Sequence, residues 1–362
     1  MPQERSKRAK RIHLLLTVLM AGIVMTSFGK NVDINSRALV HAMGIDKTRE
    51  GYEVTLQVFQ PTGPGSSTAI DASQANIRTV SCSGPTIEKA IEDGRAQLGR
   101  EPFFGHLQLI CLGSGTDLTK PHELFRFVLE DRHIDLGTEL CMSSSRAADI
   151  MNTMLNYAET SAEATGLILE KCEEYSQTVS CRLIDILSPE EDVCGAMPVL
   201  TAHEDSSVEH ISTRLIAKGR QCPYDLDEEG ALGVNILTGR AEKGSFTVKA
   251  QGVLTDISLE DLSISRRLEE RGEELILRVS IEGRALISQG DRELILKKAD
   301  QRLAEICIGA KQVTLDENSC DVIGLRRMIR HSFPEKALAN KGHTDMLYPP
   351  VKLELSVDLR SQ

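Results

Sequence analysis

"RALVHAMGIDKTREGYEVTLQVFQP", residues 37–61, is the stretch that decides the fold class. It begins with an apolar run from Ala38 to Ile45, and a polar turn that ends at Gly51 follows. The second half places an apolar side chain at every other residue from Tyr52 to Val58. Because successive side chains of a strand point to opposite faces, the pattern predicts a β-hairpin in a sheet with one buried side.

Predicted helices and strands succeed one another after this hairpin. Residues 61–76 predict a surface loop rich in Gly, Pro and Ser, which lacks the Lys and the strand-to-helix context of a phosphate-binding loop. Thr86 is expected to cap a helix that extends to Leu98. The same reasoning predicts strands at 103–115, 134–144 and 196–202, and helices at 122–131, 145–155 and most of 159–193.

The C-terminal half repeats this mixture. The patterns predict a short strand at 213–219, a helix at 225–237, strands at 245–252 and 275–288, a helix at 292–311 and a half-buried strand at 351–360. The apolar stripe of helix 292–311 favours burial in a core over a partner-binding groove, and both alternatives stay open. We therefore predict an α+β (mixed α/β), multi-domain fold with antiparallel or mixed sheets packed by helices.

The N-terminus has the pattern of a signal or an anchor. Five cations and one glutamate occupy residues 1–11, and an apolar run fills residues 12–28. Seventeen helical residues span roughly 25 Å, slightly less than the ~30 Å hydrocarbon core of a bilayer. The run therefore predicts a cleaved signal or a short transmembrane anchor, with a buried core helix as the plainer alternative. The preceding cations would keep that end in the cytoplasm and place the body outside it.

Charge and composition narrow the function classes. The net charge is −11, and because residues 1–11 carry +4, the remainder carries −15. Such a body is repelled by phosphates, which argues against a nucleic-acid binder. The nine cysteines are irregularly spaced and include no C-x-x-C pair, so zinc and thioredoxin-like sites have little support. Buried free thiols are favoured over a structural disulfide.

Local motifs for catalysis are missing. The sequence has no H-E-x-x-H and no G-x-S-x-G. His106 is the histidine most worth noting, because it follows a glycine at the start of a predicted strand, but a structural or turn role is favoured over a ligand or base. The acidic clusters "SPEED" (188–192) and "EERGEE" (269–274) lack EF-hand spacing and favour solvated turns. No catalytic, cofactor-binding or metal-binding residue is predicted.

In order and content, several segments resemble the Ger(x)C spore germination proteins, the C subunits of nutrient germinant receptors in endospore-forming bacteria. The segments are "ALVHAMGIDKTREGYEVTLQVFQP", "FFGHLQLICLG", "FRFVLEDRHIDLGTELCMSSSRAADIM", "DVIGL" and the final alternating strand. Family members typically begin with the lipoprotein signal Leu-Thr-Gly-Cys-Trp-Asp. Counting back from Gly44, Ile45 and Asp46 aligns Phe28 with the lipid-bearing cysteine. Because phenylalanine cannot form the lipid thioether, segment 12–28 itself is expected to hold the protein in the membrane.

The resemblance also implies a domain organisation and a role. It implies a three-domain mixed fold, here divided into an N-terminal germination-protein region (29–195), a connecting strand or linker, alternatively part of a small middle domain (196–212), and a C-terminal Ger(x)C domain (213–362). The implied role is a non-enzymatic extracytoplasmic subunit, held in the spore inner membrane by a single N-terminal span and docked onto integral-membrane receptor subunits. Whether it contacts the nutrient is left open.

Two other function classes are compatible with the sequence. One is a membrane-anchored enzyme or ligand-binding protein whose site is assembled from residues far apart in the chain. The other is a divergent paralogue that no longer serves germination.

Overall fold

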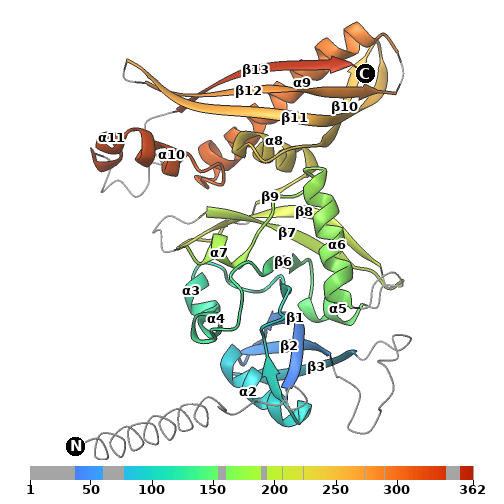
Figure 1. Ribbon diagram of the computed structural model, residues 1–362, viewed down its shortest axis with the longest axis vertical. Helices are drawn as coiled ribbons and strands as arrows, with labels where there is room; N and C mark the ends of the chain where they lie inside the picture. Colours follow the sequence, from blue (N-terminus) through green and yellow to red (C-terminus); the bar gives the residue numbers. More distant parts are fainter. Residues whose placement is uncertain are drawn as a thin grey trace, which may run out of the picture.

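The structure is a computed structural model that describes residues 37–59, 77–153, 160–188, 194–205, 207–222, 224–272, 274–288, 290–339 and 351–361. Within these residues the strands form one sheet of nine strands and one of four. The two sheets follow one another along the long axis of the molecule, with helices packed beside both (Figure 1). The predicted α+β fold with mixed sheets is confirmed.

The predicted hairpin begins the large sheet. It consists of β1 (Arg37–Lys47) and β2 (Tyr52–Phe59), which pair antiparallel with Lys47 opposite Tyr52. Thr48 N donates to Gly51 O at 3.0 Å and closes the turn. A strand that was not predicted, β3 (Ile77–Gly84), pairs antiparallel with the free edge of β2.

The large sheet continues from the other edge of β1, where the strand pairing changes from antiparallel to parallel. Parallel pairing joins β1 to β4 and β5, β5 to β6, and β6 to β7, whereas β7–β8 and β8–β9 are antiparallel. The strands are β4 (Glu101–Phe103), β5 (Leu109–Leu112), β6 (Glu139–Ser143), β7 (Cys194–Ala202), β8 (Val208–Ala217) and β9 (Asp225–Leu226).

Helices cover both faces of the large sheet. One face packs on α2 (Ile87–Leu98), α3 (Pro121–Leu124), α4 (Arg126–Glu130) and α7 (Leu183–Ile186), and the other on α5 (Ala147–Asn152) and α6 (Ser161–Glu174). The expected cap of α2 is confirmed, since Thr86 Oγ1 accepts from Lys89 N at 3.2 Å. Alternation decides the faces, because Met43 of β1 contributes to the first core and Ala42 to the second.

The small sheet is built almost entirely from long strands. Its order is β10 (Gly244–Ala250), β11 (Val253–Arg271), β12 (Glu274–Ile287) and β13 (Val351–Ser361), and β13 runs parallel to β12. It packs on α8 (Glu228–Thr238) and α9 (Arg292–Lys311). A π-helical turn η2 (Gln312–Glu317) and the helices α10 (Leu325–Ser332) and α11 (Pro334–Ala339) follow.

The hydrophobic core does not stop at the boundary between the sheets. One cluster of buried side chains joins Ala196, Leu215 and Leu226 of the large sheet to Leu277 and Leu303 of the small-sheet region. The stripe of helix 292–311 lies in this cluster, so the core alternative is confirmed over a groove. Helix α8 lies between the two sheets and contributes buried residues from almost every turn (Figure 1).

Several predicted elements are shorter than expected. Strand 103–115 is interrupted, because a turn in which Leu107 N donates to Phe104 O separates β4 from β5. Helix 122–131 divides at the fully buried Phe125 into α3 and α4. The start of helix 225–237 was placed too early, because Asp227 caps α8 by accepting from Gly230 N at 2.8 Å.

Other corrections concern longer spans. Within the described part of 159–193, only α6 and α7 are helical. Residues 196–212 lie mostly in β7 and β8 of the large sheet, and the division into three regions stays a prediction. Segment 12–28 and the whole of the loop 61–76 lie outside the described residues. In the part of the chain that the structure describes, no helix has the length and hydropathy that a bilayer span requires.

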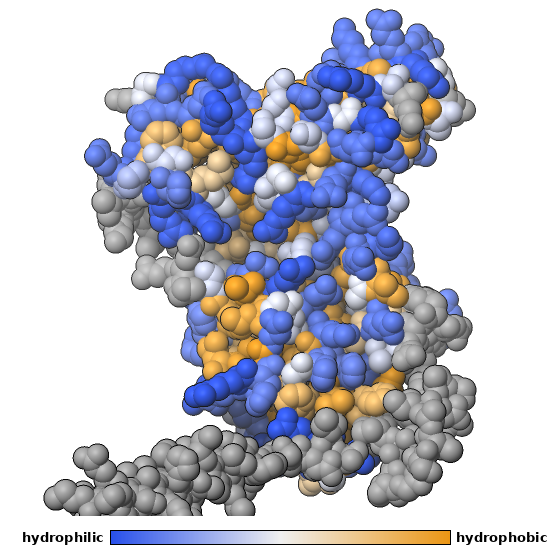
Figure 2. Space-filling model, in the orientation of Figure 1, coloured by the Kyte–Doolittle hydropathy of each residue, from blue (hydrophilic) through white to orange (hydrophobic). Residues whose placement is uncertain are grey.

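The surface shown in Figure 2 is mainly hydrophilic, as the acidic composition predicts. Hydrophobic side chains gather near the level of α7 in this view. Ile184 of α7 is 54% exposed and donates its N–H to Leu136 O at 2.9 Å, and the Leu136 side chain is 41% exposed.

Candidate functional site

His106 lies in an exposed turn between β4 and β5. Its ring stacks on His41 of β1, with centroids 6.2 Å apart, and meets the edge of Phe103 at the same distance. Burial, together with the nearby His106, lowers the pKa of His41. The pair therefore lies in an aromatic cluster beside β1 and β4. The predicted position of His106 at the start of a strand is wrong, because the residue lies in a turn.

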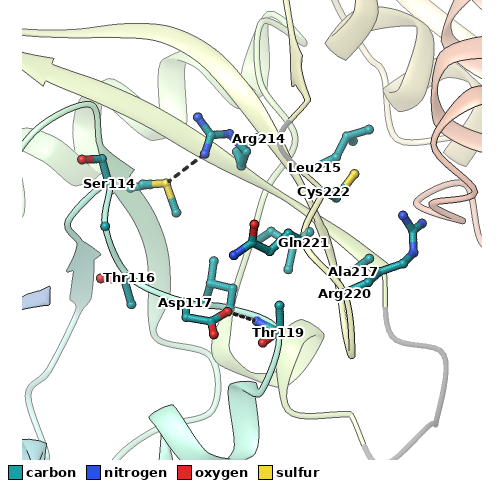
Figure 3. A pocket seen from close by; sticks show the side chains of 14 residues that line it. Ser114, Thr116, Asp117, Thr119, Arg214, Leu215, Ala217, Arg220, Gln221 and Cys222 are labelled. Atoms are coloured by element: carbon teal, nitrogen blue, oxygen red, sulfur yellow. Dashed lines mark hydrogen bonds between the residues drawn. The ribbon is translucent and has the colours of Figure 1, made fainter.

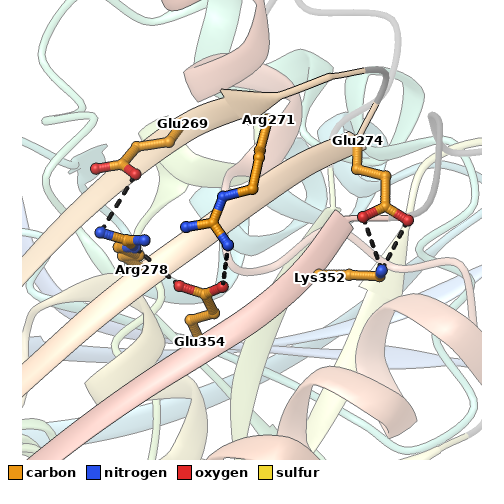
Figure 4. Close-up of polar contacts among 6 residues, drawn as sticks. All are labelled: Glu269, Arg271, Glu274, Arg278, Lys352 and Glu354. Carbon is orange, nitrogen blue, oxygen red and sulfur yellow. Dashed lines mark hydrogen bonds and ion pairs between the residues drawn. The ribbon is translucent and has the colours of Figure 1, made fainter.

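The acidic cluster at 269–274 lies at the β11–β12 hairpin, where each described carboxylate has a basic partner. Figure 4 shows the partners of Glu269 and Glu274. Glu269 pairs with Arg278 at 3.4 Å, and Glu274 pairs with Lys352 of β13 at 2.7 Å. Arg278 also donates to Glu354 at 2.9 Å. Among the described residues no group of three or more His, Cys, Asp or Glu side chains is arranged to hold a metal ion. Residues 189–192 of the other cluster lie outside the described residues.

A polar cavity of about 330 Å³ lies between the loop after β5 and the β8–β9 hairpin (Figure 3). The loop contributes Ser114 to Thr119, and the hairpin side contributes Arg214 to Ala217 and Arg220 to Cys222. Gly219 N donates to Thr119 O at 2.8 Å and joins the two walls. We regard this cavity as the candidate functional site, because it brings charged groups and a thiol together from segments about one hundred residues apart.

Backbone hydrogen bonds shape the loop wall. Gly113 N donates to Ile45 O at 2.8 Å, and the Thr116 hydroxyl donates to the same oxygen at 3.3 Å. The Thr119 backbone N–H donates to Asp117 Oδ1 at 2.9 Å and lowers the pKa of that carboxyl. Asp117 therefore presents a negative charge at the rim of the cavity.

The hairpin wall carries two guanidinium groups with different partners. Arg214 forms a two-pronged ion pair with Asp225, which raises the pKa of the arginine. Arg220 is exposed and donates to the backbone oxygen of Asn318, a neutral acceptor. The charge of Arg220 is therefore less compensated than that of Arg214. The Arg220 side of the cavity suits an anionic group of a small polar molecule, whereas the Asp117 side suits a cationic group.

The chemistry available in the cavity is limited. Cys222 is its one sulfur nucleophile among the described lining residues, and none of those residues is a histidine that could serve as a base. The arrangement supports binding more directly than acid–base catalysis. Sequence reasoning missed this site, because "KGRQCPYD" shows only the Gly and Pro signals of a turn.

A second, larger cavity of about 680 Å³ lies beside α2 and β4. The Arg37 guanidinium carbon lies 4.4 Å from the centroid of the Phe103 ring, which also meets the His133 ring at 5.0 Å. Arg95 pairs with Glu101 at 2.9 Å on the same wall. This cavity is lined by both polar and apolar side chains, and its charged groups lie at the solvent edge.

All nine cysteines lie in the described part of the chain, and none forms a disulfide. Eight are buried and Cys194 is half-buried, which confirms free thiols over a structural disulfide. Cys111 and Cys141 face each other as register partners of β5 and β6.

Comparison with known proteins gives consistent results. Residues 30–202 match the family model of the spore germination protein N-terminal domain. The chain is 22% identical over 351 residues to YfkR of Bacillus subtilis (strain 168), whose name assigns it to spore germination, with 92% of this chain and 91% of that protein covered. Its fold is similar to the crystal structure of the GerBC protein, with a TM-score of 0.53 and 13% identity over 88% of this chain and 96% of that chain. Together, these similarities support a protein of the Ger(x)C family of spore germination proteins.

Proposed function

We propose that this protein is the C subunit of a nutrient germinant receptor, acting without catalysis by docking onto integral-membrane receptor subunits. The observation that carries the proposal is the extent of the similarity, which covers nine-tenths of the chain and of the relative YfkR rather than one module. A match of that extent supports the role of the whole subunit.

The proposal includes a membrane tether formed by residues 12–28. The apolar run follows five cations, and Phe28 occupies the position of the lipid-bearing cysteine. The body then lies on the extracytoplasmic side, where its charge of −15 keeps it hydrated.

Affinity purification from detergent-solubilised spore inner membranes tests the docking role. The full chain should co-purify integral-membrane receptor subunits, and spores lacking the chain should lose the response to at least one nutrient. A chain that begins at residue 29 provides the control, since without the export and anchor segment it should leave the membrane fraction and co-purify no receptor subunit. Recovery of the full chain without any receptor subunit would contradict the proposal.

Intact mass of the membrane-extracted protein tests the tether separately. We expect the mass of an unlipidated chain that retains residues 12–28. A chain that starts near residue 28, or one that carries an acyl group, would overturn the tether and leave the docking role open.

A second candidate function, binding of a small anionic ligand, is favoured by the Arg220 side of the cavity. Calorimetry with the nutrients that trigger germination of the same spores tests it. Binding that is lost in R220Q and kept in R360Q, a change at an exposed arginine of β13, would support this candidate. Equal binding by the two variants would contradict it.

A further inference from the structure

Three cysteines from distant parts of the chain meet beside the end of β8. Cys194 at the start of β7 is the register partner of Ala217. The Sγ of Cys320, which follows η2, lies 3.2 Å from Ile216 O. Cys222 lines the polar cavity together with Ile216 and Ala217, and its side chain lies in the same core cluster as Cys320. The thiols therefore converge on two adjacent residues of one strand.

The contacts among these thiols decide which one is ionised. Hydrogen bonding from Cys320 lowers the pKa of Cys222 to about 6, and the nearby Arg220 acts in the same direction against burial. Contacts with Cys194 and Cys222, together with burial, raise the pKa of Cys320 far above its ordinary value. Cys222 therefore ionises more readily than Cys320. The contact with Cys320 lowers the pKa of Cys194 as well, but Cys194 does not line the cavity.

Access also distinguishes the two sulfurs. Cys222 is 8% exposed and lines the cavity between the loop and the hairpin (Figure 3). Cys320 is 0% exposed and lies behind it in the core. A small reagent that enters the cavity therefore meets Cys222 first.

We propose that Cys222 is a thiol modification site that reacts with low-molecular-weight disulfides, and that Cys320 resolves the product into a Cys222–Cys320 disulfide. In the first step, the Cys222 thiolate attacks one sulfur of the reagent, a mixed disulfide forms, and one small thiolate leaves. In the second step, Cys320 gives up its proton to the departing thiolate or to water, and its sulfur attacks Cys222. The second small thiolate then leaves. Two protein thiols are oxidised and one reagent disulfide is reduced to two thiols.

The resulting bond would join the large-sheet region to the small-sheet region covalently. Cys222 belongs to the β8–β9 hairpin of the large sheet, and Cys320 to the segment between η2 and α10 beside the small sheet. Arg220 already donates to Asn318 O across the same boundary. The disulfide would make this noncovalent contact permanent under oxidising conditions, a property that does not depend on the proposed receptor role.

A second cysteine pair provides an internal control. Cys111 and Cys141 are register partners in adjacent strands and are both 0% exposed. Contact with Cys141 and burial raise the pKa of Cys111 well above its ordinary value. Neither residue lines the polar cavity. Proximity without ionisation or access should leave this pair reduced.

The test uses the full chain, purified in detergent, reduced, and then incubated with oxidised glutathione at about pH 7. Peptide mass spectrometry should find the Cys222–Cys320 bond in the wild type and in C141S. C320S should instead retain glutathione on Cys222. C222S and C222A cannot form the 222–320 bond. They should consume oxidised glutathione at least about tenfold more slowly than the wild type, because the remaining ordinary thiols are only a few per cent thiolate at neutral pH.

Three outcomes would overturn the proposal. The wild type could stay fully reduced, C320S could carry glutathione at cysteines other than Cys222, or oxidation could join Cys111 to Cys141 as fast as Cys222 to Cys320. The adduct in C320S keeps the test independent of folding defects in the Cys222 variants, because Cys222 is unchanged there. Circular dichroism of each variant confirms that the compared proteins are folded.

Discussion

Asp46 is a buried carboxylate at the point where β1, the loop after β5 and helix α5 meet. Its side chain is 6% exposed and accepts hydrogen bonds from Ala147 N at 2.8 Å and Ala148 N at 3.0 Å. A Cβ added at Gly113 would lie 2.1 Å from Asp46 Oδ1, so the loop can approach only as glycine. The Gly-Ile-Asp sequence of the hairpin thus ends on a residue that fixes the start of a helix one hundred residues later.

Replacement of Asp46 tests this role. D46A leaves two buried N–H groups without an acceptor, and we expect a loss of about 3 kcal/mol in the free energy of unfolding. Urea denaturation measures the loss. D149N on the exposed side of the same helix is the control, with an expected loss below about 1 kcal/mol. Similar losses in both variants would mean that Asp46 acts only through the general charge of the helix end.

Glu174 gives the molecule a pH dependence. It lies at the end of α6 and accepts from Lys171 at 2.6 Å and from Lys243, and these contacts lower its pKa from 4.5 to about 2. Because the folded-state pKa lies below the unfolded one, the stabilisation is present above pH 4.5 and is lost as the pH falls toward 2.

The expected result for E174Q is a slightly lower Tm than the wild type at pH 7, with a difference that shrinks to zero as the pH falls through this window. Calorimetry across the pH range measures it. High salt at pH 7 should also reduce the difference, because the ion pairs are solvent-exposed. A difference that is constant from pH 7 to 2 would exclude the ion pairs as its cause.

At the scale of elements, the close crossing of α8 and α9 depends on one glycine. A Cβ added at Gly233 would lie 2.6 Å from Ala310 Cβ and 2.8 Å from Ile306 O. Gly309, one residue before Ala310 on the facing helix, has no atom within 4 Å of an added Cβ. Gly233 therefore has no room for a side chain, whereas Gly309 in the same helix pair has open space beside it.

This difference predicts opposite effects of one substitution. G233A should lower the free energy of unfolding by about 1–3 kcal/mol, because the helices must move apart. G309A should raise it by about 0.5–1 kcal/mol, because alanine favours the helix and meets no neighbour. Chemical denaturation of both variants provides the measurement. A stabilised G233A would show that the helices can separate without cost.

The elements that were predicted well are those with long, regular patterns. The hairpin at β1–β2 and the helix at 292–311 show their periodicity over many residues, so their bounds were close to the observed ones. The division of helix 122–131 at Phe125 could not be predicted, because packing of a fully buried ring against distant strands determines it. The sequence patterns did not predict β11, which is a single strand of 19 residues. A register shift between Glu260 and Ser263 interrupts its pairing with β12.

The candidate site could not be predicted for a related reason. Its walls come from residues 114–119 and 214–222, and only the pairing of β8 beside β7 in the large sheet places them together. Neither segment contains a local motif. The sequence alone was enough to predict the family resemblance and the polar turns. The juxtaposition of Arg220, Cys222 and Cys320, in contrast, depends on tertiary contacts.

At the scale of the whole molecule, the two sheets share one hydrophobic core. Asn235 lies within it, in the middle of α8, and is 5% exposed. Its Nδ2 donates to Thr178 O at 2.7 Å, which connects α8 to the segment between α6 and α7 beside the large sheet. Arg266 of β11 adds a bond to Thr238 O at 2.8 Å from the other side. A helix bonded to both neighbours should couple their unfolding.

This coupling can be measured by hydrogen exchange with mass spectrometry. N235A removes the donor to Thr178 O, and we expect a loss of about 1–3 kcal/mol. If the sheets unfold as one unit, amides of β7 in the large sheet and of β12 in the small sheet should lose the same protection. T247A, at an exposed hydrogen bond in the β10–β11 hairpin, should change both by less than about 1 kcal/mol. In a single cooperative unit, any local destabilisation lowers the protection of all the slowest-exchanging amides. Loss of protection confined to one sheet in N235A would therefore mean that the two sheets unfold independently, although they share a hydrophobic core.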